Sequence, residues 1–358
     1  MKMDIFKIFD PIPHPVIAAR GDTIEYKNAA AEALFSGDEH NRVSAVIPAD
    51  YLRFDQEHFV SGFVLNGEDT SLLVSTVEGL RVYTLLTNGP SEDAILADAL
   101  SNLCTALSDT VSSLKLAAGK LLPRVTDGRD EKTSVYAGIL YHDCYLLQRL
   151  CGNLGAVCGS QSFSGEASSY FDLADLCRQC AEAAAHLTAP RHLEITVSCS
   201  QERLAYYGVA RYLERLLLNL LSNSIKAVAD GGKITIELTR QEAYLDLVVS
   251  DNGCGIADGD LADVFFRYKR RQALPVPGEV GMGLSVARKI ADLYGGRILL
   301  ESQPDKGTRV TVRLPIRQAR DTVVHVMPGD YQLSGMNPVL MELSDALPYT
   351  CYTEQYMD

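Results

Sequence analysis

The sequence predicts an α+β protein of several domains, and three observations carry that prediction. The chain has 358 residues, more than one hydrophobic core usually serves. Apolar residues make up 47% and charged residues 22%, so each domain can bury an ordinary core. The spacing of apolar residues then changes along the chain, from short strand-like runs to helical stripes and finally to alternating helices and strands.

The formal net charge is −13, which argues against nonspecific binding to nucleic acid or to an anionic membrane. No apolar run approaches the ~18 residues that span a bilayer, and the N-terminus lacks the apolar segment of a signal peptide. We therefore expect a cytoplasmic protein without membrane insertion. Its nine cysteines are expected to be free thiols. Cys177 and Cys180 form a CxxC pair that we interpret as small packing residues, with a metal site as the alternative.

Residues 1–90 are expected to form a small α+β domain. The runs VIAA, TIEY, LLVSTV and VYTLLT are typical of short strands, and KNAAAEALF is typical of a short helix between them. Glycine and charged residues separate these elements, as in a compact domain with tight connections.

Residues 91–160 are predicted to form an antiparallel helical hairpin. Apolar residues from Leu96 to Leu121 recur at steps of three and four, which places them on one stripe of a helix. Proline and glycine then end this helix. The second stripe consists of Val135, Ile139, Leu146, Leu150, Leu154 and Val157. Because the apolar face of such a hairpin needs a partner, we expect a homodimer with a four-helix bundle. Packing onto the chain's own domains is the alternative.

The Gly/Ser-rich stretch 159–169 is typical of a linker. Helices and strands alternate over residues 170–317, which we expect to be one further domain. The tail, residues 318–358, has several tyrosines and an acidic end, and we assign it no role.

The first of three clusters in residues 170–317 is LLLNLLSNSIK. Asn219 and Asn223 lie four residues apart and so share one face of a helix, with Lys226 farther along that face. Carboxamide oxygens suit Mg2+, and an ammonium can meet phosphate oxygens. The plain alternative is a pair of solvated asparagines.

The other two clusters combine glycines with the ends of regular elements. In LDLVVSDNGCGI an apolar strand ends at Asp251, followed by Gly253 and Gly255. An Asp there can accept a hydrogen bond from a purine amino group, and the glycines allow a base to approach closely; an ordinary turn is the alternative. In VGMGLSVARKI, Gly281 and Gly283 precede a helical run, whose first backbone N–H groups can bind phosphate.

Together and in this order, the clusters resemble the ATP-binding domain of sensor histidine kinases. NLLSNSIK resembles the asparagine box of that family, DNGCGI its first glycine box, VFFRY its phenylalanine box and GMGLSVARKIADLYGG its second glycine box. GTRVTVRLP resembles the closing strand. The resemblance runs continuously from Phe171 to Ile316.

The resemblance implies an α/β sandwich of the Bergerat type, with ATP held between the sheet and a mobile lid at about residues 257–280. It implies that Asn223 is the Mg2+ ligand, that Asp251 accepts from adenine and that Lys226 contacts a phosphate. The further ATP contacts that it implies are Gly253, Gly255, Gly281, Gly283, Leu284 and Thr308. Gyrases and heat-shock chaperones carry a catalytic Glu at the position of Asn219. Because Asn cannot act as a general base, Asn219 favours the kinase branch.

The flanking segments agree with this resemblance. The predicted hairpin lies where histidine kinases carry their dimerisation and phosphoacceptor domain. Residues 1–90 resemble a PAS sensor domain through IPHPVIAARGDTIEYKNAAAEALF, which is similar to its opening strands and helix.

The usual phosphoacceptor histidine is missing from the first hairpin helix. Ser101 takes the place of the histidine and Asn102 the place of the acid that follows it, and no histidine lies between His58 and His142. A hydroxyl is a poor nucleophile without a base. His142 is followed by an acid, as in the family, but it lies on the second helix, where packing is the main alternative to a role as acceptor.

We therefore expect a dimeric, PAS-linked sensor histidine kinase-like protein that binds MgATP for phosphoryl transfer in two-component signal transduction, with a response regulator as its partner. A catalytically degenerate, nucleotide-gated adaptor for a response regulator is the second hypothesis. A protein serine kinase similar to the anti-sigma-factor relatives of this domain is the third. The missing acceptor is the feature that separates the first two.

Overall fold

A computed structural model of the chain describes residues 14–35, 41–48, 58–65, 68–77, 79–87, 131–158, 168–257, 282–316 and 337–352, together with a few isolated positions. The chain forms two compact units, one of them built mainly from the first 91 residues. The first predicted hairpin helix, with Ser101, lies outside the described residues except at Val111, as do almost all residues of the predicted lid. Within the described ranges, no helix has the length and apolar character needed to cross a membrane.

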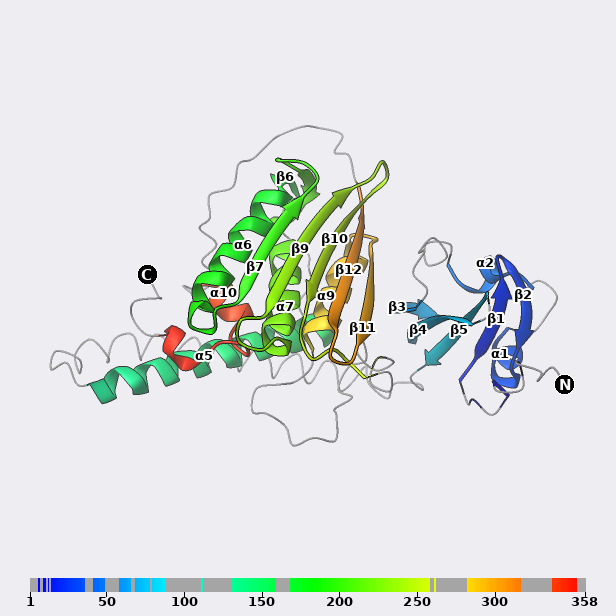
Figure 1. Cartoon of the computed structure of the whole chain (residues 1–358), viewed down its shortest axis with the longest axis horizontal. Helices are drawn as coiled ribbons and strands as arrows, with labels where there is room; N and C mark the ends of the chain where they lie inside the picture. The colour runs from blue at the N-terminus through cyan, green and yellow to red at the C-terminus, as the bar shows by residue number, and fades with distance from the viewer. Residues whose placement is uncertain are drawn as a thin grey trace. The chain divides into compact units, whose positions relative to one another are not determined.

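The N-terminal unit is an antiparallel sheet with the strand order β2-β1-β5-β4-β3 (Figure 1). Its elements are β1 (Val16–Arg20), β2 (Thr23–Lys27), α1 (Ala29–Leu34), α2 (Val43–Val46), β3 (Phe59–Leu65), β4 (Glu68–Val77) and β5 (Leu80–Thr87). The four predicted strands coincide with β1, β2, β4 and β5, and the predicted helix with α1. The sequence patterns did not indicate β3 or α2.

Asn28 joins this sheet to α1. Its Oδ1 accepts hydrogen bonds from the backbone N–H groups of Val16 (2.9 Å) and Ala31 (3.0 Å), and its Nδ2 donates to the carbonyls of Ile12 (3.0 Å) and His14 (2.9 Å). The side chain is therefore both the N-cap of α1 and a bridge to the segment before β1. A buried amide with this many partners fixes the local backbone.

The second unit contains a sheet with the strand order β11-β12-β10-β9-β7. Strands β7 and β9 are parallel, whereas β9, β10 and β12 pair antiparallel. Helices α6, α7 and α9 cover one face of this sheet, as Figure 1 shows. The elements are α5 (Glu131–Cys158), β6 (Ser169–Asp172), α6 (Leu173–Leu187), η3 (Ala189–Arg191), β7 (Glu194–Cys199), β8 (Ala205–Gly208), α7 (Ala210–Ala227), β9 (Lys233–Arg240), β10 (Tyr244–Asp251), α9 (Gly283–Leu293), β11 (Arg297–Gln303) and β12 (Gly307–Pro315).

The core between sheet and helices follows from the spacing of apolar residues. In β9, Ile234, Ile236 and Leu238 alternate with more exposed residues, so their side chains share one face of the sheet. Helix α7 lies over that face and is buried along most of its length, with Leu213 and Ile225 fully inaccessible to solvent. The long apolar run of α7 thus places its polar residues at defined positions in a packed helix.

Helix α6 begins at a side-chain cap and carries the CxxC pair. Asp172 Oδ1 accepts from the backbone N–H groups of Ala174 (3.0 Å) and Asp175 (3.2 Å). Cys177 and Cys180 are buried free thiols on this helix. Burial raises the pKa of Cys177 to about 12 and raises that of Cys180 as well, so both side chains are protonated.

Helix α5 corresponds to the second predicted hairpin helix, but within the chain it packs through a different face from the predicted stripe. Its buried side chains include Tyr145, Arg149 and Asn153. Ile139, a member of the predicted stripe, is 38% exposed. The buried face contacts α9 and the C-terminal elements. The alternative of packing onto the chain's own domains therefore describes this face, and the homodimer stays a prediction.

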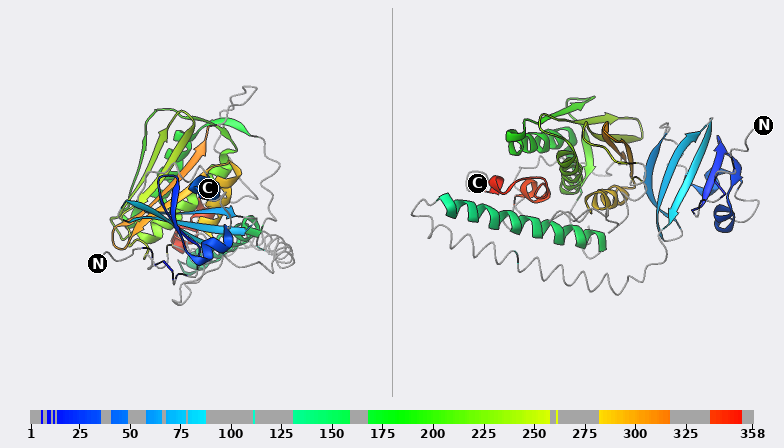
Figure 2. Two further views of the ribbon diagram at one scale, coloured as in Figure 1. Left: turned by 90° about the vertical axis from the view of Figure 1, so that its right-hand side faces the viewer. Right: turned by 60° about the horizontal axis from the view of Figure 1, so that its bottom comes forward.

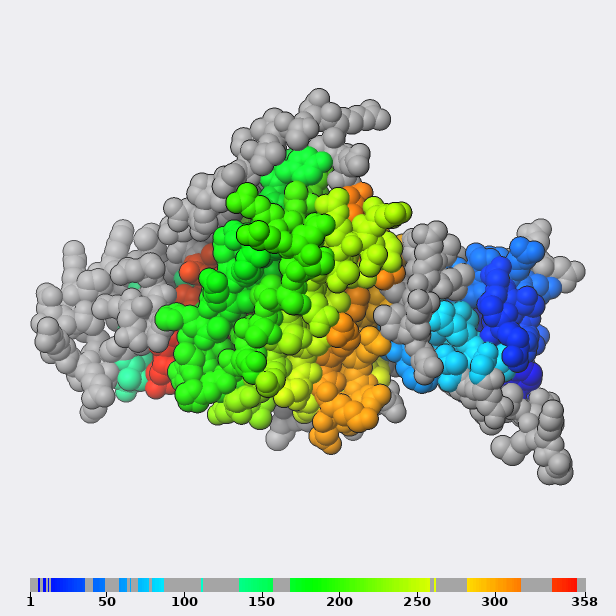
Figure 3. All heavy atoms as spheres, turned by 45° about the horizontal axis from the view of Figure 1, so that its top comes forward, coloured from blue at the N-terminus to red at the C-terminus, as the bar shows by residue number. Residues whose placement is uncertain are grey.

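The C-terminal segment (residues 337–352) forms α10 (Pro338–Glu342) and η4 (Tyr349–Tyr352). Asn337 caps α10 by accepting from the N–H groups of Val339 and Leu340. The segment packs against α5 and α7, and the right-hand view of Figure 2 shows it between α5 and the remainder of the unit. Figure 3 shows it beside α6. Part of the tail, for which the sequence suggested no role, is thus packed against the domain.

Candidate functional site

Asp251 ends β10 and is fixed by hydrogen bonds from two other elements. Its Oδ1 accepts from the N–H of Gly253 (2.9 Å) and lies 3.3 Å from the N–H of Thr308, at the start of β12, while its Oδ2 accepts from Ser224 Oγ on α7 (3.0 Å). Burial raises the pKa of Asp251 above its ordinary value, although these three hydrogen bonds oppose the shift. The carboxyl group is oriented without any cationic partner among these contacts.

The glycines around Asp251 allow close backbone contacts. A Cβ on Gly253 would lie 2.5 Å from the carbonyl oxygen of Ala227, at the end of α7. Gly307 has a φ of +95°, and a Cβ there would lie 1.9 Å from the carbonyl oxygen of Asp251. Gly255 is equally restricted, but by the carbonyl of Gln303 at 2.0 Å. Gly255 thus contacts the end of β11, rather than the residues that hold Asp251.

The first and third sequence clusters meet where α9 begins. A Cβ on Gly283 would lie 3.1 Å from Asn219 Oδ1 and 3.7 Å from either side-chain atom of the Asn223 amide. Gly283 thus approaches the asparagine pair closely, and a side chain at this position would crowd Asn219. Leu284 follows on α9 and is half-buried, and Gly281 lies outside the described residues.

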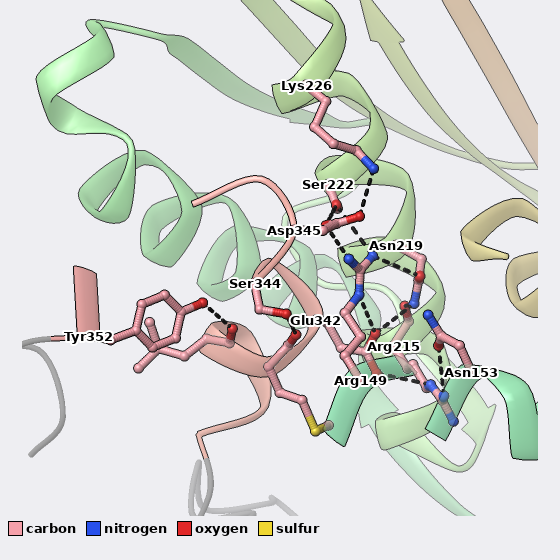
Figure 4. Close-up of polar contacts among 12 residues, drawn as sticks. Arg149, Asn153, Arg215, Asn219, Ser222, Lys226, Glu342, Ser344, Asp345 and Tyr352 are labelled. Carbon is pink, nitrogen blue, oxygen red and sulfur yellow. Dashed lines mark hydrogen bonds and ion pairs between the residues drawn. The ribbon is translucent and has the colours of Figure 1, made fainter. Parts of the chain in front are cut away.

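Asn219 is fully buried, so the solvated alternative does not describe it. Its Nδ2 donates to the carbonyl of Arg215 (2.9 Å) and to Glu342 Oε2 of the C-terminal segment (2.9 Å). Its Oδ1 accepts from Arg149 Nη2 of α5 (3.3 Å). Three separate elements therefore meet at this side chain, as Figure 4 shows.

Lys226 points toward the C-terminal segment in the same view (Figure 4). Its Nζ lies 2.6 Å from Asp345 Oδ2, and Asp345 Oδ1 accepts from Ser222 Oγ at 2.5 Å. Burial of the Asp345 carboxyl is outweighed by the positive charges of Arg149 and Lys226 and by hydrogen bonds, which together hold its pKa below the ordinary value.

Glu214, on α7, is a further acidic side chain whose environment favours the neutral form. Burial, together with the negative charge of Glu342, raises the pKa of Glu214 to about 7, against the opposing charge of Arg211. Glu214 is thus partly protonated near neutral pH.

His142 packs against the C-terminal segment. Its Nδ1 lies 3.0 Å from Asp143 Oδ1 and its Nε2 lies 3.1 Å from the carbonyl oxygen of Ser344. The ring also packs edge-on against Tyr352 at a centroid distance of 5.1 Å. Both ring nitrogens are engaged, which favours the packing interpretation over a free phosphoacceptor.

Sequence reasoning missed Arg149, Arg215, Glu342 and Asp345. The sequence gives one hint of Arg149, because this charged residue directly precedes Leu150 of the predicted apolar stripe and so lies near the face expected to pack. The two carboxylates lie in a tail more than a hundred residues from their partners on α7, with separations of 119 to 123 residues. No motif or periodicity connects residues so far apart.

Residues 208–318 match the family described as histidine kinase-, DNA gyrase B- and HSP90-like ATPases. Asn219, Asn223, Asp251, Gly283 and Thr308 all fall within this range. Residues 208–318 therefore form a domain of this ATPase class.

Among curated proteins, the chain is 32% identical over 130 residues to the adaptive-response sensory kinase SasA of Prochlorococcus marinus, covering 36% of this chain and 35% of that protein. It is 36% identical over 107 residues to the histidine protein kinase DivJ of Caulobacter vibrioides, covering 30% and 18%. The chain therefore spans about a third or less of the length of these relatives.

Among solved structures, the chain is similar to full-length ShkA in complex with AMPPNP, with a TM-score of 0.51 and 18% identity. The alignment covers 62% of this chain and 46% of that one. At this identity the likeness concerns the fold.

Proposed function

We propose that this chain is a histidine kinase-like signalling protein that binds MgATP for phosphoryl transfer. The observation that carries the proposal is the meeting of the three sequence clusters around α7. Asp251 is oriented at one end of the helix, and Gly283 at the start of α9 lies close to Asn219 and Asn223 farther along it. The match of residues 208–318 to an ATPase family supports the same conclusion.

The described residues fit such a ligand. The carboxyl of Asp251, which has neutral donors as its partners, can accept a hydrogen bond from the adenine amino group. Asn223 offers a carboxamide oxygen to Mg2+, and Lys226 and the first N–H groups of α9 can meet the phosphates. Bound Mg2+ would supply neutralisation of the charge that develops on the transferred phosphoryl group.

Asn219 would have a positioning role rather than that of a base, because an amide cannot take a proton from the nucleophile. Ser101 and His142 are the acceptor candidates within the chain. We further propose a homodimer, a cytoplasmic location, a response regulator as partner and a PAS-like role for the N-terminal unit. The order of β1, β2 and α1 along the chain supports the last of these.

Metal-dependent binding tests the first part of this proposal. We expect Asn223→Ala to abolish the Mg2+-dependent component of ATP affinity in calorimetry. Asn223→Asp keeps a hard oxygen ligand and should retain that component. Equal, unchanged affinity in both variants would show that the metal assignment is wrong.

The nucleotide-gated adaptor is the second candidate, and the engagement of both His142 ring nitrogens favours it. Incubation with γ-labelled MgATP separates the two. Acid-labile label lost in His142→Ala identifies a displaced histidine acceptor, and acid-stable label lost in Ser101→Ala identifies serine chemistry. ATP binding without any label identifies the adaptor, and label on a serine of a partner protein would identify a serine kinase.

A further inference from the structure

Three cations from two helices surround two carboxylates of the C-terminal segment (Figure 4). We call Arg149, Arg215 and Lys226 the cationic cradle. Arg215 Nε lies 2.9 Å from Glu342 Oε1, and Lys226 Nζ lies 2.6 Å from Asp345 Oδ2. Arg149 pairs with both acids, directly with Asp345 and at 3.7 Å with Glu342.

Most of this cluster is removed from solvent, although the side chains of Arg215 and Lys226 remain 17% and 25% exposed. The exposed fraction of the side chain is 4% for Arg149, 2% for Glu342 and 9% for Asp345. Buried ion pairs of this kind are weak stabilisers, because desolvation offsets most of the attraction between the charges. Apolar side chains would hold the segment in place equally well. The charges therefore call for a role beyond packing.

Glu342 does not give two buried donors of the cradle well-aligned hydrogen bonds. Arg149 Nε and Arg215 Nε lie 3.7 Å and 2.9 Å from the Glu342 carboxylate as ion pairs, without hydrogen-bond geometry. Buried donors are normally satisfied, and a guanidinium presents five N–H donors in a planar fork that suits phosphate. A polyphosphate, with more oxygens than two carboxylates, is a better match for the cradle.

The cradle also overlaps the groups that the proposed function assigns to ATP. Asp345 holds Lys226, the proposed phosphate contact, and Glu342 holds Asn219, which lies close to Gly283 at the start of α9. The carboxylates therefore engage side chains on both sides of Asn223 along α7. A phosphate cannot occupy the position beside Lys226 that the Asp345 carboxylate already takes.

The C-terminal segment is held by specific contacts as well as by charge. Leu340, Leu343, Leu347 and Tyr352 are buried. Tyr352 Oη donates to the carbonyl of Leu340 (2.7 Å), and Cys351 Sγ donates to the carbonyl of Leu187 on α6 (3.5 Å). These contacts define one bound position for the segment, with both acids in the cradle.

We propose that the cationic cradle binds the terminal phosphates of the nucleotide, and that the C-terminal segment occupies it with Glu342 and Asp345 in their place. This inference rests on the proposed function. Nucleotide binding and docking of the segment then exclude each other. If the segment is docked in about 90–99% of molecules, the apparent affinity for ATP is about 10–100-fold weaker than that of the open cradle.

The test uses the full chain and titrates ATP, ADP and AMP, with Mg2+, into wild type and the double variant Glu342→Gln/Asp345→Asn. We expect the double variant to bind ATP at least about tenfold more tightly. The gain should shrink from ATP to ADP and vanish for AMP, because only the terminal phosphates reach the cradle. The matched control Asp175→Asn/Glu237→Gln removes two exposed acids and should behave as wild type.

A second variant tests the cradle itself. Adding Arg149→Gln to the double variant should remove most of the gain for ATP while leaving AMP unchanged. A peptide with the sequence of residues 337–352 should weaken ATP binding by the double variant, whereas the peptide with both acids neutralised should not. The peptide comparison remains valid if the double variant is less stable than wild type, because both peptides are tested on the same protein.

Two outcomes separate the inference from the proposed function. Equal ATP affinity in wild type and the double variant, or an equal gain for ATP and AMP, would overturn the inference and leave ATP binding in place. Failure of every form of the protein to bind any adenine nucleotide would overturn the proposed function, and the inference with it.

Discussion

Asp251 and Asp345 are two buried carboxyl groups in one candidate site, and their environments differ in kind. Asp251 is held by backbone N–H groups and one hydroxyl, and burial raises its pKa. Asp345 is held by Arg149 and Lys226, and their charges lower its pKa despite burial. Asp251 is oriented by neutral donors and can accept a further hydrogen bond from a ligand. The negative charge of Asp345, in contrast, is already balanced by Arg149 and Lys226. In our proposal, Asp251 binds a ligand and Asp345 takes the place of one.

The largest expected effect is at the rigid backbone around Asp251. Gly307→Ala should lower the free energy of unfolding by about 3 kcal/mol or more, because a Cβ must fit 1.9 Å from a carbonyl oxygen at a φ of +95°. Gly231→Ala is the matched control, since Gly231 also has a positive φ (+76°) but open space around its Cβ; it should cost about 1 kcal/mol. Urea unfolding of both variants measures the difference, and equal losses would contradict the steric argument.

Asp251→Asn tests the ligand side of the comparison. Loss of the charged acceptor should weaken adenine nucleotides by about 1.5–3 kcal/mol, roughly 10- to 100-fold, with much less effect on guanine nucleotides. Asp246→Asn makes the same change on the same strand, where the acid pairs with Arg313, and should leave binding unchanged. An equal loss for all triphosphates would indicate misfolding instead.

Arg149→Met tests the charged side. Breaking a buried ion pair usually costs about 3–5 kcal/mol, but here we expect about 1–2 kcal/mol of unfolding free energy, because the C-terminal segment can leave and return its acids to water. Arg309→Ala breaks an exposed pair with Glu237 and should cost less than about 0.5 kcal/mol. A loss near 5 kcal/mol for Arg149→Met would mean that the segment is an inseparable part of the fold.

The smallest expected effect depends on pH. The raised pKa of Glu214, about 7, means that the folded protein binds this proton more tightly than the unfolded chain, in which the ordinary value is 4.5. Its contribution to stability is therefore fully present below about pH 4.5 and declines as the pH rises to about 7. Glu214→Gln should gain stability relative to wild type between pH 5 and pH 8, by about 1 kcal/mol or more. Glu237→Gln, at an exposed site, should show no such trend in urea unfolding.

The same contrast explains how much the sequence predicts. The sequence predicts Asp251, Asn219, Asn223 and Gly283 as site residues because each belongs to a short motif, in which neighbouring residues fix the strand end or helix start. The strands of the second unit follow from alternation of the kind seen at Ile234 and Ile236. Such local patterns predict the elements and the backbone-built part of the site.

The remaining part of the site depends on tertiary packing. Glu342 and Asp345 reach α7 across more than a hundred residues, and the face of α5 that binds them carries Arg149 and Asn153 among its buried residues. Apolar periodicity favours Ile139 as a packed residue, yet its side chain is partly exposed within the chain. When ion pairs determine which face of a helix is buried, the spacing of apolar residues does not indicate that face.

The alkylation rate of Cys351 can report how often the C-terminal segment leaves its docked position. Its thiol donates to the carbonyl of Leu187, and burial raises its pKa, so the reactive thiolate is scarce while the C-terminal segment is docked. Cys199, on β7, is a partly exposed free thiol outside the proposed nucleotide contacts and supplies an internal reference on the same chain. The ratio of the two alkylation rates therefore reports how often the segment departs, and added nucleotide should change the rate at Cys351 alone.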